Sequence, residues 1–560
     1  MRQSYLDLVR KQIIGNDLLF ETPYGLRNMF YADYTASGRG LRFIEEKLLR
    51  IQKSYANTHT EDDFSGKYLT GLFQQAGMRI KRLVNAGESG KIFPVGSGST
   101  GALKKLQEII GVYIPPLTKE RLYQACSEVG DVGEGVRRLI ESRTPVVFIG
   151  PYEHHTNELM WREALAEVVV VRLSGRGGMD LADLEEKVSA PRFRDRIKYG
   201  SFSAGSNITG VKTPVYEVAR ICHRHDVGVF FDFAAVAPYA EINMNRDGES
   251  YFDAIFFSPH KFLGGPGSCG ILVIHERLYR RDLPPTTAGG GTVVYVGFDA
   301  HDYSEDIETR EMAGTPPILQ TIKAALAMEV KEKIGAAEIE KTERENLALF
   351  LARLREIPNI RLVGRYDTPD LTPIVSFNIV HQDRILHPKF VTKLLNDLFG
   401  IQSRAGCSCA GPYGHLLLRI DADTSDRFRQ LIGRGYQGIK PGWVRINIHY
   451  TFDESDVDFL AKAIGFVAKQ GDLFLNEYGF DWPTGEWRHL GFQEKKPDLS
   501  LDNKFRTLAT DLSRKASFRT AYFREASRLA KRLEKAAARE FRKDEADIED
   551  LKSFYYIHPA

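Results

Sequence analysis

Residues 256–273 read FFSPHKFLGGPGSCGILV, and this stretch places a lysine directly after a short apolar run. The run covers residues 254–257 and is followed by Ser258, His260 and Lys261. A continuous apolar run of this length is typical of a strand that is buried on both faces of a sheet. A lysine amine in the partly dry site beyond such a strand can form a Schiff base with a carbonyl group.

Four more apolar runs show the same arrangement between residues 90 and 275. Each run ends in Gly, Ser, His, Asn or Asp and is followed by polar or helical sequence; the runs are residues 91–95, 145–149, 199–203 and 227–231. Buried strands that alternate with helices predict an α/β fold with a mostly parallel sheet. Chemistry gathers at the carboxyl ends of such strands, and all five runs have polar residues there.

Three of these run ends carry groups that suit one cofactor. Asp232 ends one run, and a carboxylate there can keep a pyridinium nitrogen protonated. His154 follows another run and can lie flat against an aromatic ring. Residues 98–100, Gly-Ser-Thr, precede a helix whose N-terminus can hold a phosphate. Each feature alone also fits a surface loop or a helix cap, but together with Lys261 they describe a pyridoxal-phosphate site.

The composition is that of a globular protein without a strong charge bias. The chain has 560 residues, of which 43% are hydrophobic and 27% charged, and its 76 basic and 74 acidic residues leave a net charge of +2. This balance argues against nucleic acid or a membrane surface as a partner. No stretch approaches the roughly 18 apolar residues that a membrane span requires, and the N-terminus lacks a signal-peptide core. We therefore expect a cytoplasmic enzyme.

The chain is too long for one compact core, so several domains are expected. The expected parts are an N-terminal segment that packs with the small domain (1–30), a large cofactor-binding domain (31–310), a small α+β domain (311–470), and an aromatic-rich segment with a helical extension (471–560). Helices are predicted at 112–145, 318–356, 389–399, 454–468 and 503–548, strands at 362–379 and 443–449, and a loop at 403–415. The extension is either an arm that packs on its own body or on a dimer mate, or a docking surface for a partner.

Motifs that occur in one order along the chain point to a known family. They are YADYTASGRG (31–40), YANTHT (55–60), GSGSTGA (96–102), EHHTNELMW (153–161), AGSNITGVKTP (204–214), FFDFAA (230–235), FFSPHKFLGGPGSCGILV (256–273), MAGTPP (312–317), SRAGCSCAGP (403–412) and VRINIHYT (444–451). From residue 30 to about residue 469 the chain resembles the class V family of fold-type-I pyridoxal-phosphate enzymes, most of all its cysteine desulfurase and selenocysteine lyase branch. The resemblance implies a large domain with a mostly parallel, seven-stranded sheet between helices and a smaller α+β domain, to which this chain adds a helical C-terminal extension.

The resemblance also implies roles for residues of the predicted cofactor site. Lys261 would hold the cofactor covalently, His154 would stack on its ring, and Asp232 would pair with the ring nitrogen. The phosphate would be held by Ser99, Thr100, Ser258 and His260, and by Thr315 of a neighbouring subunit, which implies a homodimer. Asn57 and His59 stand where the family lines the mouth of the site.

The resemblance implies the substrate-binding residues as well. Asn207 would lie near the ring oxygen or the substrate carboxylate. Arg445 would bind that carboxylate, because a guanidinium fork suits two carboxylate oxygens better than an ammonium does.

Residues 403–412 resemble the loop that carries the nucleophilic cysteine of desulfurases. Because that cysteine follows Arg-x-Gly-x-x, the resemblance selects Cys409, and Cys407 lies two residues before it. Arg404 and His415 are close enough in sequence to favour a thiolate. A buried cysteine pair and half of a zinc site are the alternatives, but no second Cys/His cluster appears at ligand spacing in the sequence, so no metal is expected.

One residue departs from the pattern of the desulfurases. Ala235 stands where many of them have a glutamine, three residues after the aspartate, and the molybdenum-cofactor sulfurases also lack this glutamine. The resemblance implies release of sulfur from cysteine, or of selenium from selenocysteine, through a persulfide on Cys409, with a protein as a candidate sulfur acceptor. The alternatives are another class V reaction (amino transfer, epimerisation or carbon–sulfur lysis) in which Cys409 is not a nucleophile, and a non-catalytic interaction protein.

Overall fold

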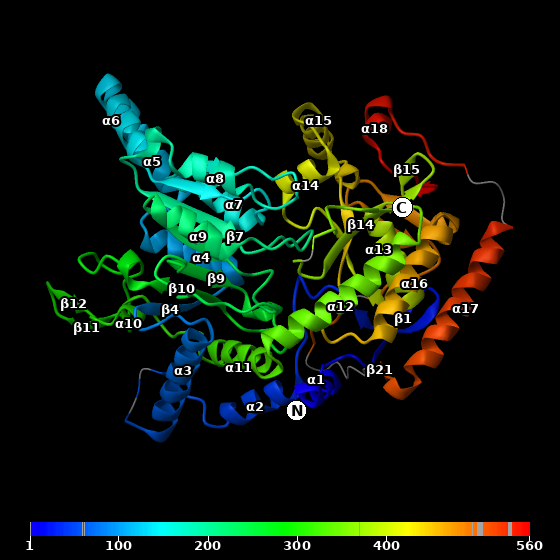
Figure 1. The fold of residues 1–560 in the computed structure, drawn as a ribbon, viewed down its shortest axis with the longest axis horizontal. Helices are drawn as coiled ribbons and strands as arrows, with labels where there is room; N and C mark the ends of the chain where they lie inside the picture. Colours follow the sequence, from blue (N-terminus) through cyan, green and yellow to red (C-terminus); the bar gives the residue numbers. More distant parts are fainter. Residues whose placement is uncertain are drawn as a thin grey trace. The chain divides into compact units, whose positions relative to one another are not determined.

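The computed structural model describes residues 2–58, 60, 62–368, 370–495, 497–500, 508–535 and 540–559 (Figure 1). The chain forms two compact units. The first unit consists of Met1–Gln12, Ser37–Ser206 and Val211–Ile339, and the second unit consists of Ile13–Ala36, Asn207–Gly210 and Glu340–Ala560. Each unit therefore combines segments that are far apart in the sequence.

A seven-stranded sheet forms the centre of the first unit. Its strand order is β4-β10-β9-β8-β7-β5-β6, and β10 (Gly270–His275) runs antiparallel to both of its neighbours, while the other neighbouring pairs are parallel. The five apolar runs of the sequence are β4 (Gly90–Val95), β5 (Val146–Ile149), β7 (Lys198–Ser203), β8 (Val227–Asp232) and β9 (Ala254–Phe257). The predicted mostly parallel sheet is confirmed. Because these five strands point the same way, their carboxyl ends meet at one edge of the sheet.

Helices cover both faces of this sheet. On one face, α4 (Gly98–Ile109) and α7 (His155–Glu163) pack against strand residues; this core includes Phe93, Leu103, Leu106, Val147, Trp161, Phe230 and Phe256. On β8 the next residue, Phe231, contacts Phe252 with ring centroids 4.7 Å apart. The helix α9 (Val215–Arg224) also packs against β8. Alternate residues of β8 thus face two packed layers, which explains the continuous apolar run.

The predicted helical insertion at 112–145 is a pair of helices, α5 (Pro116–Glu128) and α6 (Gly130–Arg143). The other elements of the first unit are α1 (Arg2–Lys11), α2 (Arg42–Gln52), α3 (Phe64–Leu83), β6 (Glu167–Val170), α8 (Leu181–Val188), β11 (Val293–Val296), β12 (His301–Tyr303), α10 (Ile307–Arg310) and α11 (Ile318–Ile334). The helix α12 (Ala336–Arg355) begins in the first unit and continues into the second.

An antiparallel sheet of strand order β13-β14-β18-β17, with β15 paired to β14, forms the centre of the second unit. The helix α13 (Pro388–Phe399) packs against β17, β18 and α16. The remaining bounds are β1 (Leu18–Thr22), β2 (Gly25–Asn28), β3 (Phe30–Tyr31), β13 (Ile360–Leu362), β14 (Ile374–His381), β15 (Arg384–Ile385), β16 (Ile401–Gln402), β17 (Arg404–Gly406), α14 (Gly411–Leu418), α15 (Ala422–Gly433), β18 (Trp443–Asn447) and α16 (Glu454–Gln470).

The aromatic-rich segment after residue 470 contributes to the core of the second unit. Tyr478, Phe480 and Trp487 are buried, and the ring of Trp487 lies 4.7 Å from that of Phe390 in α13. The elements here are β19 (Tyr478–Asp481), β20 (Glu486–His489), β21 (Leu508–Ala509), α17 (Lys515–Glu534), α18 (Ala546–Leu551) and β22 (His558–Pro559). The extension therefore packs on its own unit, as one of the two alternatives for it expects.

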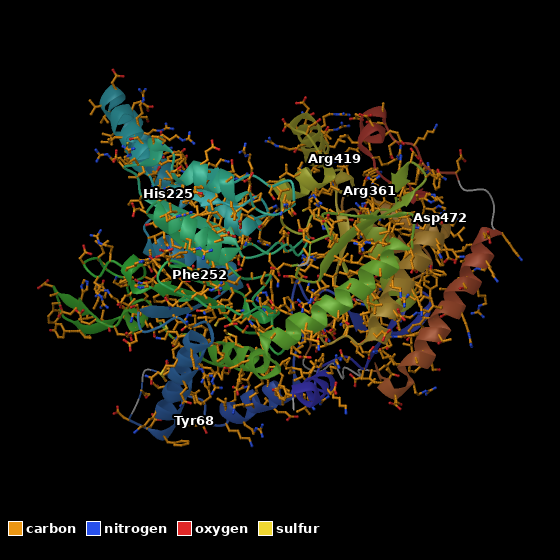
Figure 2. The ribbon with its side chains drawn as sticks, viewed as in Figure 1. Tyr68, His225, Phe252, Arg361, Arg419 and Asp472 are labelled. Atoms are coloured by element: carbon orange, nitrogen blue, oxygen red, sulfur yellow. The ribbon has the colours of Figure 1, made fainter. Side chains whose placement is uncertain are left out.

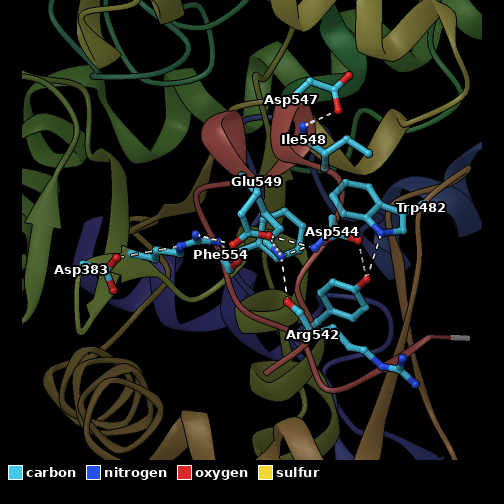
Figure 3. Close-up of polar contacts among 11 residues, drawn as sticks. Asp383, Trp482, Arg542, Asp544, Asp547, Ile548, Glu549 and Phe554 are labelled. Carbon is cyan, nitrogen blue, oxygen red and sulfur yellow. Dashed lines mark hydrogen bonds and ion pairs between the residues drawn. The ribbon is translucent and has the colours of Figure 1, made fainter. Parts of the chain in front are cut away.

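The last part of the extension is held by ion pairs between a buried lysine and two partly exposed carboxylates (Figure 3). The Lys552 side chain is completely buried, and its Nζ lies 2.6 Å from Asp544 and 2.7 Å from Glu549. The Glu549 carboxylate also accepts a 2.6 Å hydrogen bond from Arg384 of β15. The side chain of Ile548 packs in an apolar cluster with residues of α15. Residues 540–559 are thus anchored to the second unit at several points.

The observed elements differ from the expectations in three places. Residues 503–507 and 536–539 of the predicted helix at 503–548 lie outside the described residues, and Leu508–Ala509 form β21, which pairs with β1. The predicted loop at 403–415 contains β17 and the start of α14. The compact units divide at residue 339 rather than 310, because α11 packs against α3, and residues 13–30, but not 1–12, belong to the second unit.

None of the helices in the described part of the chain combines the length and the hydropathy that crossing a membrane requires.

Candidate active site

The lysine-bearing turn follows β9 in the first unit and is held by backbone hydrogen bonds. Pro259–Lys261 form a short 3-10 helix, in which the Lys261 N–H donates to the Ser258 carbonyl at 3.0 Å. The Gly38 N–H donates to the His260 carbonyl at 2.9 Å. A Cβ at Gly38 would lie 2.0 Å from the Phe262 carbonyl oxygen, so glycine is required for this approach. The motif at residues 31–40 thus supports the turn that carries the lysine.

Asp232 ends β8, the strand next to β9. Its carboxyl group is buried and accepts a 2.8 Å hydrogen bond from the Ala234 N–H. Burial raises the pKa of Asp232 to about 6, and the positive charge of Lys261 opposes this rise. The structure therefore brings Asp232 and Lys261 within electrostatic range of each other at the carboxyl edge of the sheet.

Two hydroxyl groups and an imidazole, those of Ser99, Ser258 and His260, lie at the N-terminus of α4 and together form what we call the cup. The Ser99 N–H donates to Ser258 Oγ at 2.9 Å, and Ser258 Oγ donates to Ser99 Oγ at 3.2 Å. Gly98 has φ +58°, and a Cβ there would lie 2.8 Å from Ser258 Oγ and 3.0 Å from Cε1 of His260. Burial lowers the pKa of His260 to about 4, and the charge of Lys261 adds to this effect. The cup thus combines a neutral imidazole with the positive end of a helix dipole.

His154 is the N-cap residue of α7. Its Nδ1 accepts a 3.1 Å hydrogen bond from the Thr156 N–H, so the neutral imidazole carries its proton on Nε2. The hydroxyl of Thr156 lies 2.8 Å from that of Thr100, which joins the first turns of α7 and α4. Thr100, the residue after Ser99, is therefore linked to the first turn of α7.

Glu153 was missed by the sequence analysis. This carboxyl group is buried and accepts hydrogen bonds from Ser203 N–H and Oγ (2.9 and 2.6 Å), from Asn157 Nδ2 (2.6 Å) and from the Gly150 N–H (3.0 Å). Burial raises its pKa to about 7. These contacts join the ends of β5 and β7 to α7 and fix the residue before His154. The sequence feature that could have identified Glu153 is an acidic residue shortly after a buried strand.

Thr315 is exposed and lies beside Asn57, which was predicted to line the mouth of the site. Its Oγ1 accepts a 3.0 Å hydrogen bond from Asn57 Nδ2. His59 lies outside the described residues. Asn57 and Thr315 therefore lie in contact on the surface of the first unit.

The residues predicted to bind the substrate belong to the second unit, where Arg445 lies on β18. The Arg445 side chain is only 2% exposed; Nη2 donates to Asp33 Oδ1 at 2.8 Å, and Nη1 donates to the Asn207 carbonyl at 3.1 Å. Its Nε has no hydrogen-bond partner among the described residues. Burial lowers the pKa of Arg445, and the charge of Asp33 opposes this effect. Asp33, in the motif at 31–40, is a second residue that the sequence analysis missed.

The cysteine loop forms a tight turn after β17. The Ala410 N–H donates to the Cys407 carbonyl at 3.3 Å, and Ser408 and Cys409 both have positive φ, +52° and +58°. Asn207 Nδ2 donates to the Ser408 carbonyl at 2.7 Å, so its amide holds this turn. A thiolate at Cys409 would raise the pKa of Arg445, which places the sulfur within electrostatic range of the guanidinium.

The contacts of His415 do not support the expectation that this residue favours a thiolate in the cysteine loop. Its Nδ1 lies 2.7 Å from the Gly411 carbonyl, to which it donates, and its Nε2 accepts from Ser425 Oγ at 3.0 Å. Both ring nitrogens are thus engaged within α14 and α15, which leaves neither for a thiol. The helix α14 ends at Leu418, and the next residue, Arg419, has a left-handed conformation with φ +56°. Arg419 is labelled in Figure 2.

The sequence profile of the aminotransferase class-V family matches residues 134–460. The chain belongs to the aminotransferase class-V family. It is 28% identical over 389 residues to a probable cysteine desulfurase of Halalkalibacterium halodurans, which covers 69% of this chain and 84% of that protein. It is 30% identical over 279 residues to a cysteine desulfurase of Synechococcus elongatus, which covers 49% of this chain and 41% of that protein.

Solved structures share the fold of this class V chain. The apo structure of a cysteine desulfurase from Thermococcus onnurineus has a TM-score of 0.63 at 22% identity and covers 83% of this chain and 98% of that one. A cysteine desulfurase from Escherichia coli has a TM-score of 0.57 at 22% identity and covers 78% of this chain and 93% of that one. At these identities the likeness concerns the fold, and it confirms the predicted fold type I.

The cofactor of the class V family is pyridoxal 5′-phosphate, and the first unit fits it. The absence of a side chain at Gly98 leaves room beside the helix N-terminus, where a Cβ would meet Ser258 and His260. The buried Asp232 and the nearby Lys261 supply a carboxylate and an amine at the same edge of the sheet. Ala235 is buried and offers no side-chain donor where many desulfurases have glutamine.

Proposed function

We propose that this class V enzyme releases sulfur from L-cysteine, or selenium from selenocysteine, with Cys409 as the accepting thiol. The observation that carries the proposal is an exposed Cys409 in a turn that Asn207 holds, within electrostatic range of the buried Arg445. The relatives named as cysteine desulfurases support the same reaction.

The residues of the first unit would hold pyridoxal phosphate. Lys261 would bind its aldehyde carbon, Asp232 would face the ring nitrogen, and His154 would lie against the ring. The phosphate would be bound by Ser99, Thr100, Ser258, His260 and the N–H groups of the first turn of α4. When bound, the cofactor supplies an electron sink that weakens the bonds at the α-carbon of an amino acid.

The residues of the chain carry the other steps of this proposal. Arg445 and Asn207 orient the substrate carboxylate. The Nζ of Lys261 removes the α-proton of the substrate and later returns a proton to the product. The Cys409 thiolate attacks the sulfur of bound cysteine; an S–S bond forms as the carbon–sulfur bond breaks, and the carbon skeleton leaves as alanine.

We also propose a cytoplasmic homodimer that passes sulfur to a protein acceptor. Thr315 supports the dimer, because it is exposed beside Asn57 in the first unit and stands where the family reaches the phosphate of a neighbouring subunit. The exposed thiol of Cys409 supports the acceptor, because a buried sulfur could not be handed on.

Product analysis with the cofactor-loaded protein and L-cysteine tests the proposal. The expected products are alanine and protein-bound sulfane sulfur. Cys409→Ser should keep the absorbance of the bound cofactor and lose alanine formation, whereas Cys126→Ser, a change of a half-buried thiol on α5, should behave like the wild type. Normal alanine formation by Cys409→Ser would contradict the role of this thiol.

Another class V reaction is the alternative, although the similarity to cysteine desulfurases does not favour it. Ala235 removes the donor that many desulfurases place against the cofactor ring, so the ring hydroxyl would be held differently. Pyruvate or a keto acid from a panel of amino acids, with activity independent of Cys409, would identify amino transfer or carbon–sulfur lysis instead.

A further inference from the structure

Two of the five cysteines are exposed, and both lie in the turn after β17. Cys407 and Cys409 are exposed, whereas Cys222 and Cys269 are buried and Cys126 is half-buried. Burial raises the pKa of the Cys222 thiol, and it raises the pKa of the Cys269 thiol to about 11. Exposed thiols exchange sulfur far more readily than buried ones, so this turn holds the reactive thiols of the described chain.

The turn keeps the two exposed thiols close together. Consecutive Cα atoms are about 3.8 Å apart, so the Cα atoms of residues 407 and 409 cannot be more than about 7 Å apart. The 3.3 Å hydrogen bond from the Ala410 N–H to the Cys407 carbonyl closes the turn. Direct contact between cysteine sulfurs needs Cα atoms about 4.4–6.8 Å apart, and the spacing of residues 407 and 409 along the chain is compatible with this range.

One of the two thiols lies near a residue that we assign to the substrate. Cys409 is within electrostatic range of the buried Arg445 guanidinium, to which we assign the substrate carboxylate. Asn207 holds the Ser408 carbonyl between the two cysteines, and the Ser408 side chain is buried. Cys409 is therefore the thiol that we assign to the substrate, and sulfur would pass from it to Cys407.

We propose that Cys407 is a second sulfur carrier that takes the sulfane sulfur from Cys409, a step that rests on the proposed function. The Cys407 thiol loses its proton to solvent, and its sulfur attacks the outer sulfur of the Cys409 persulfide. A new S–S bond forms at Cys407 as the S–S bond at Cys409 breaks, and Cys409 leaves as a thiolate. No net oxidation occurs, and Cys409 can then accept sulfur from a second substrate molecule.

The test loads the holoenzyme with L-cysteine in the absence of an acceptor. The alanine formed in the burst is measured, the thiols are alkylated, and the peptide that spans both cysteines is fragmented to locate extra sulfur. The wild type should carry extra sulfur on Cys407 and on Cys409. Cys407→Ser should carry extra sulfur on Cys409 alone, and its alanine burst should be about twofold smaller because one sulfur-accepting thiol is lost. Cys126→Ser serves as the matched control and should match the wild type, and the cofactor absorbance of each variant reports correct folding.

Two results would overturn the second carrier while leaving the proposed function intact. One is extra sulfur on Cys409 but none on Cys407, with equal bursts in the wild type and Cys407→Ser. The other is a disulfide between the two cysteines with one sulfide released for each disulfide, which would make Cys407 a resolving thiol instead. A wild type that forms no alanine would overturn the proposed function itself, and the carrier with it.

Discussion

Gly98→Ala tests whether the first turn of α4 binds the phosphate of the cofactor. Gly98 has φ +58°, and a Cβ there would lie 2.8 Å from Ser258 Oγ and 3.0 Å from His260 Cε1. Holding an alanine in the left-handed region costs about 1–2 kcal/mol. Displacing the serine and histidine side chains from their rotamers costs about 1 kcal/mol more. The sum of about 2–3 kcal/mol corresponds to roughly a 30- to 150-fold change in an equilibrium constant.

We expect this penalty to weaken the binding of pyridoxal phosphate, because the side chains that must move are those that line the cup. The assay titrates cofactor-free protein with pyridoxal phosphate and follows the absorbance of the bound chromophore, with thermal unfolding of the cofactor-free protein in parallel. Gly101→Ala is the matched control in the same helix. Its Cβ would meet nothing nearer than Ser97 Oγ at 3.4 Å, and alanine within a helix is favoured over glycine by about 1 kcal/mol.

Two outcomes would refute this reasoning. Unchanged affinity and unchanged Tm in Gly98→Ala would show that the left-handed glycine and its close contacts are not needed. A lower Tm with unchanged affinity would show that the strain acts on the fold and that the phosphate binds elsewhere. A loss of affinity in Gly101→Ala equal to that in Gly98→Ala would mean that any change in this helix has the same effect.

Three further changes test other buried charges. Asp33→Asn removes the carboxylate partner of Arg445, so urea unfolding should show a free energy of unfolding about 3–5 kcal/mol lower than that of the wild type. Added free alanine should restore part of the lost Tm. An unchanged free energy of unfolding would mean that the pair is not buried. Lys552→Met leaves two carboxylates without their shared cation, so stability should fall by about 3 kcal/mol and the C-terminal segment should be cut faster by protease, whereas the exposed Lys531→Met should alter neither. The pKa of Asp232 is about 6 in the folded protein against 3.8 ordinarily, so its contribution to stability is present at low pH and is lost as pH rises from about 4 to about 6. Cofactor-free Asp232→Asn should therefore gain up to about 3 kcal/mol over the wild type above this range and little below it, and a difference that does not vary with pH would contradict the raised pKa.

Much of the sheet and of its edge could be predicted from short patterns. The residues Asp232 and Lys261 follow apolar runs that are strands of one sheet, and Ser99 opens a helix directly after another strand. The length and the order of the apolar runs suffice for this prediction, because parallel strands bring their carboxyl ends to a common edge of the sheet whatever the details of packing. The same patterns were weaker after residue 500, where Leu508–Ala509 add a short strand to β1 instead of continuing a helix.

The partners of the buried charged groups could not be predicted in this way. Glu153 receives its hydrogen bonds from residues of two other elements, and His415 is engaged by Gly411 and Ser425 rather than by a thiol. Which donor reaches which acceptor depends on side-chain rotamers and on the packing of neighbouring elements. A local sequence pattern does not record either of these.

The sequence by itself determined the alternation of strands and helices and the chemical groups at the strand ends, because both depend on local hydrophobic periodicity and on chain order. Only the tertiary structure decided that Asp33 pairs with Arg445, 412 residues further along the chain, and that Asn207 holds the turn of Cys409. Burying an arginine requires a nearby charge or hydrogen-bond acceptor, and the residue that satisfies this requirement is chosen by how distant segments pack within the second unit.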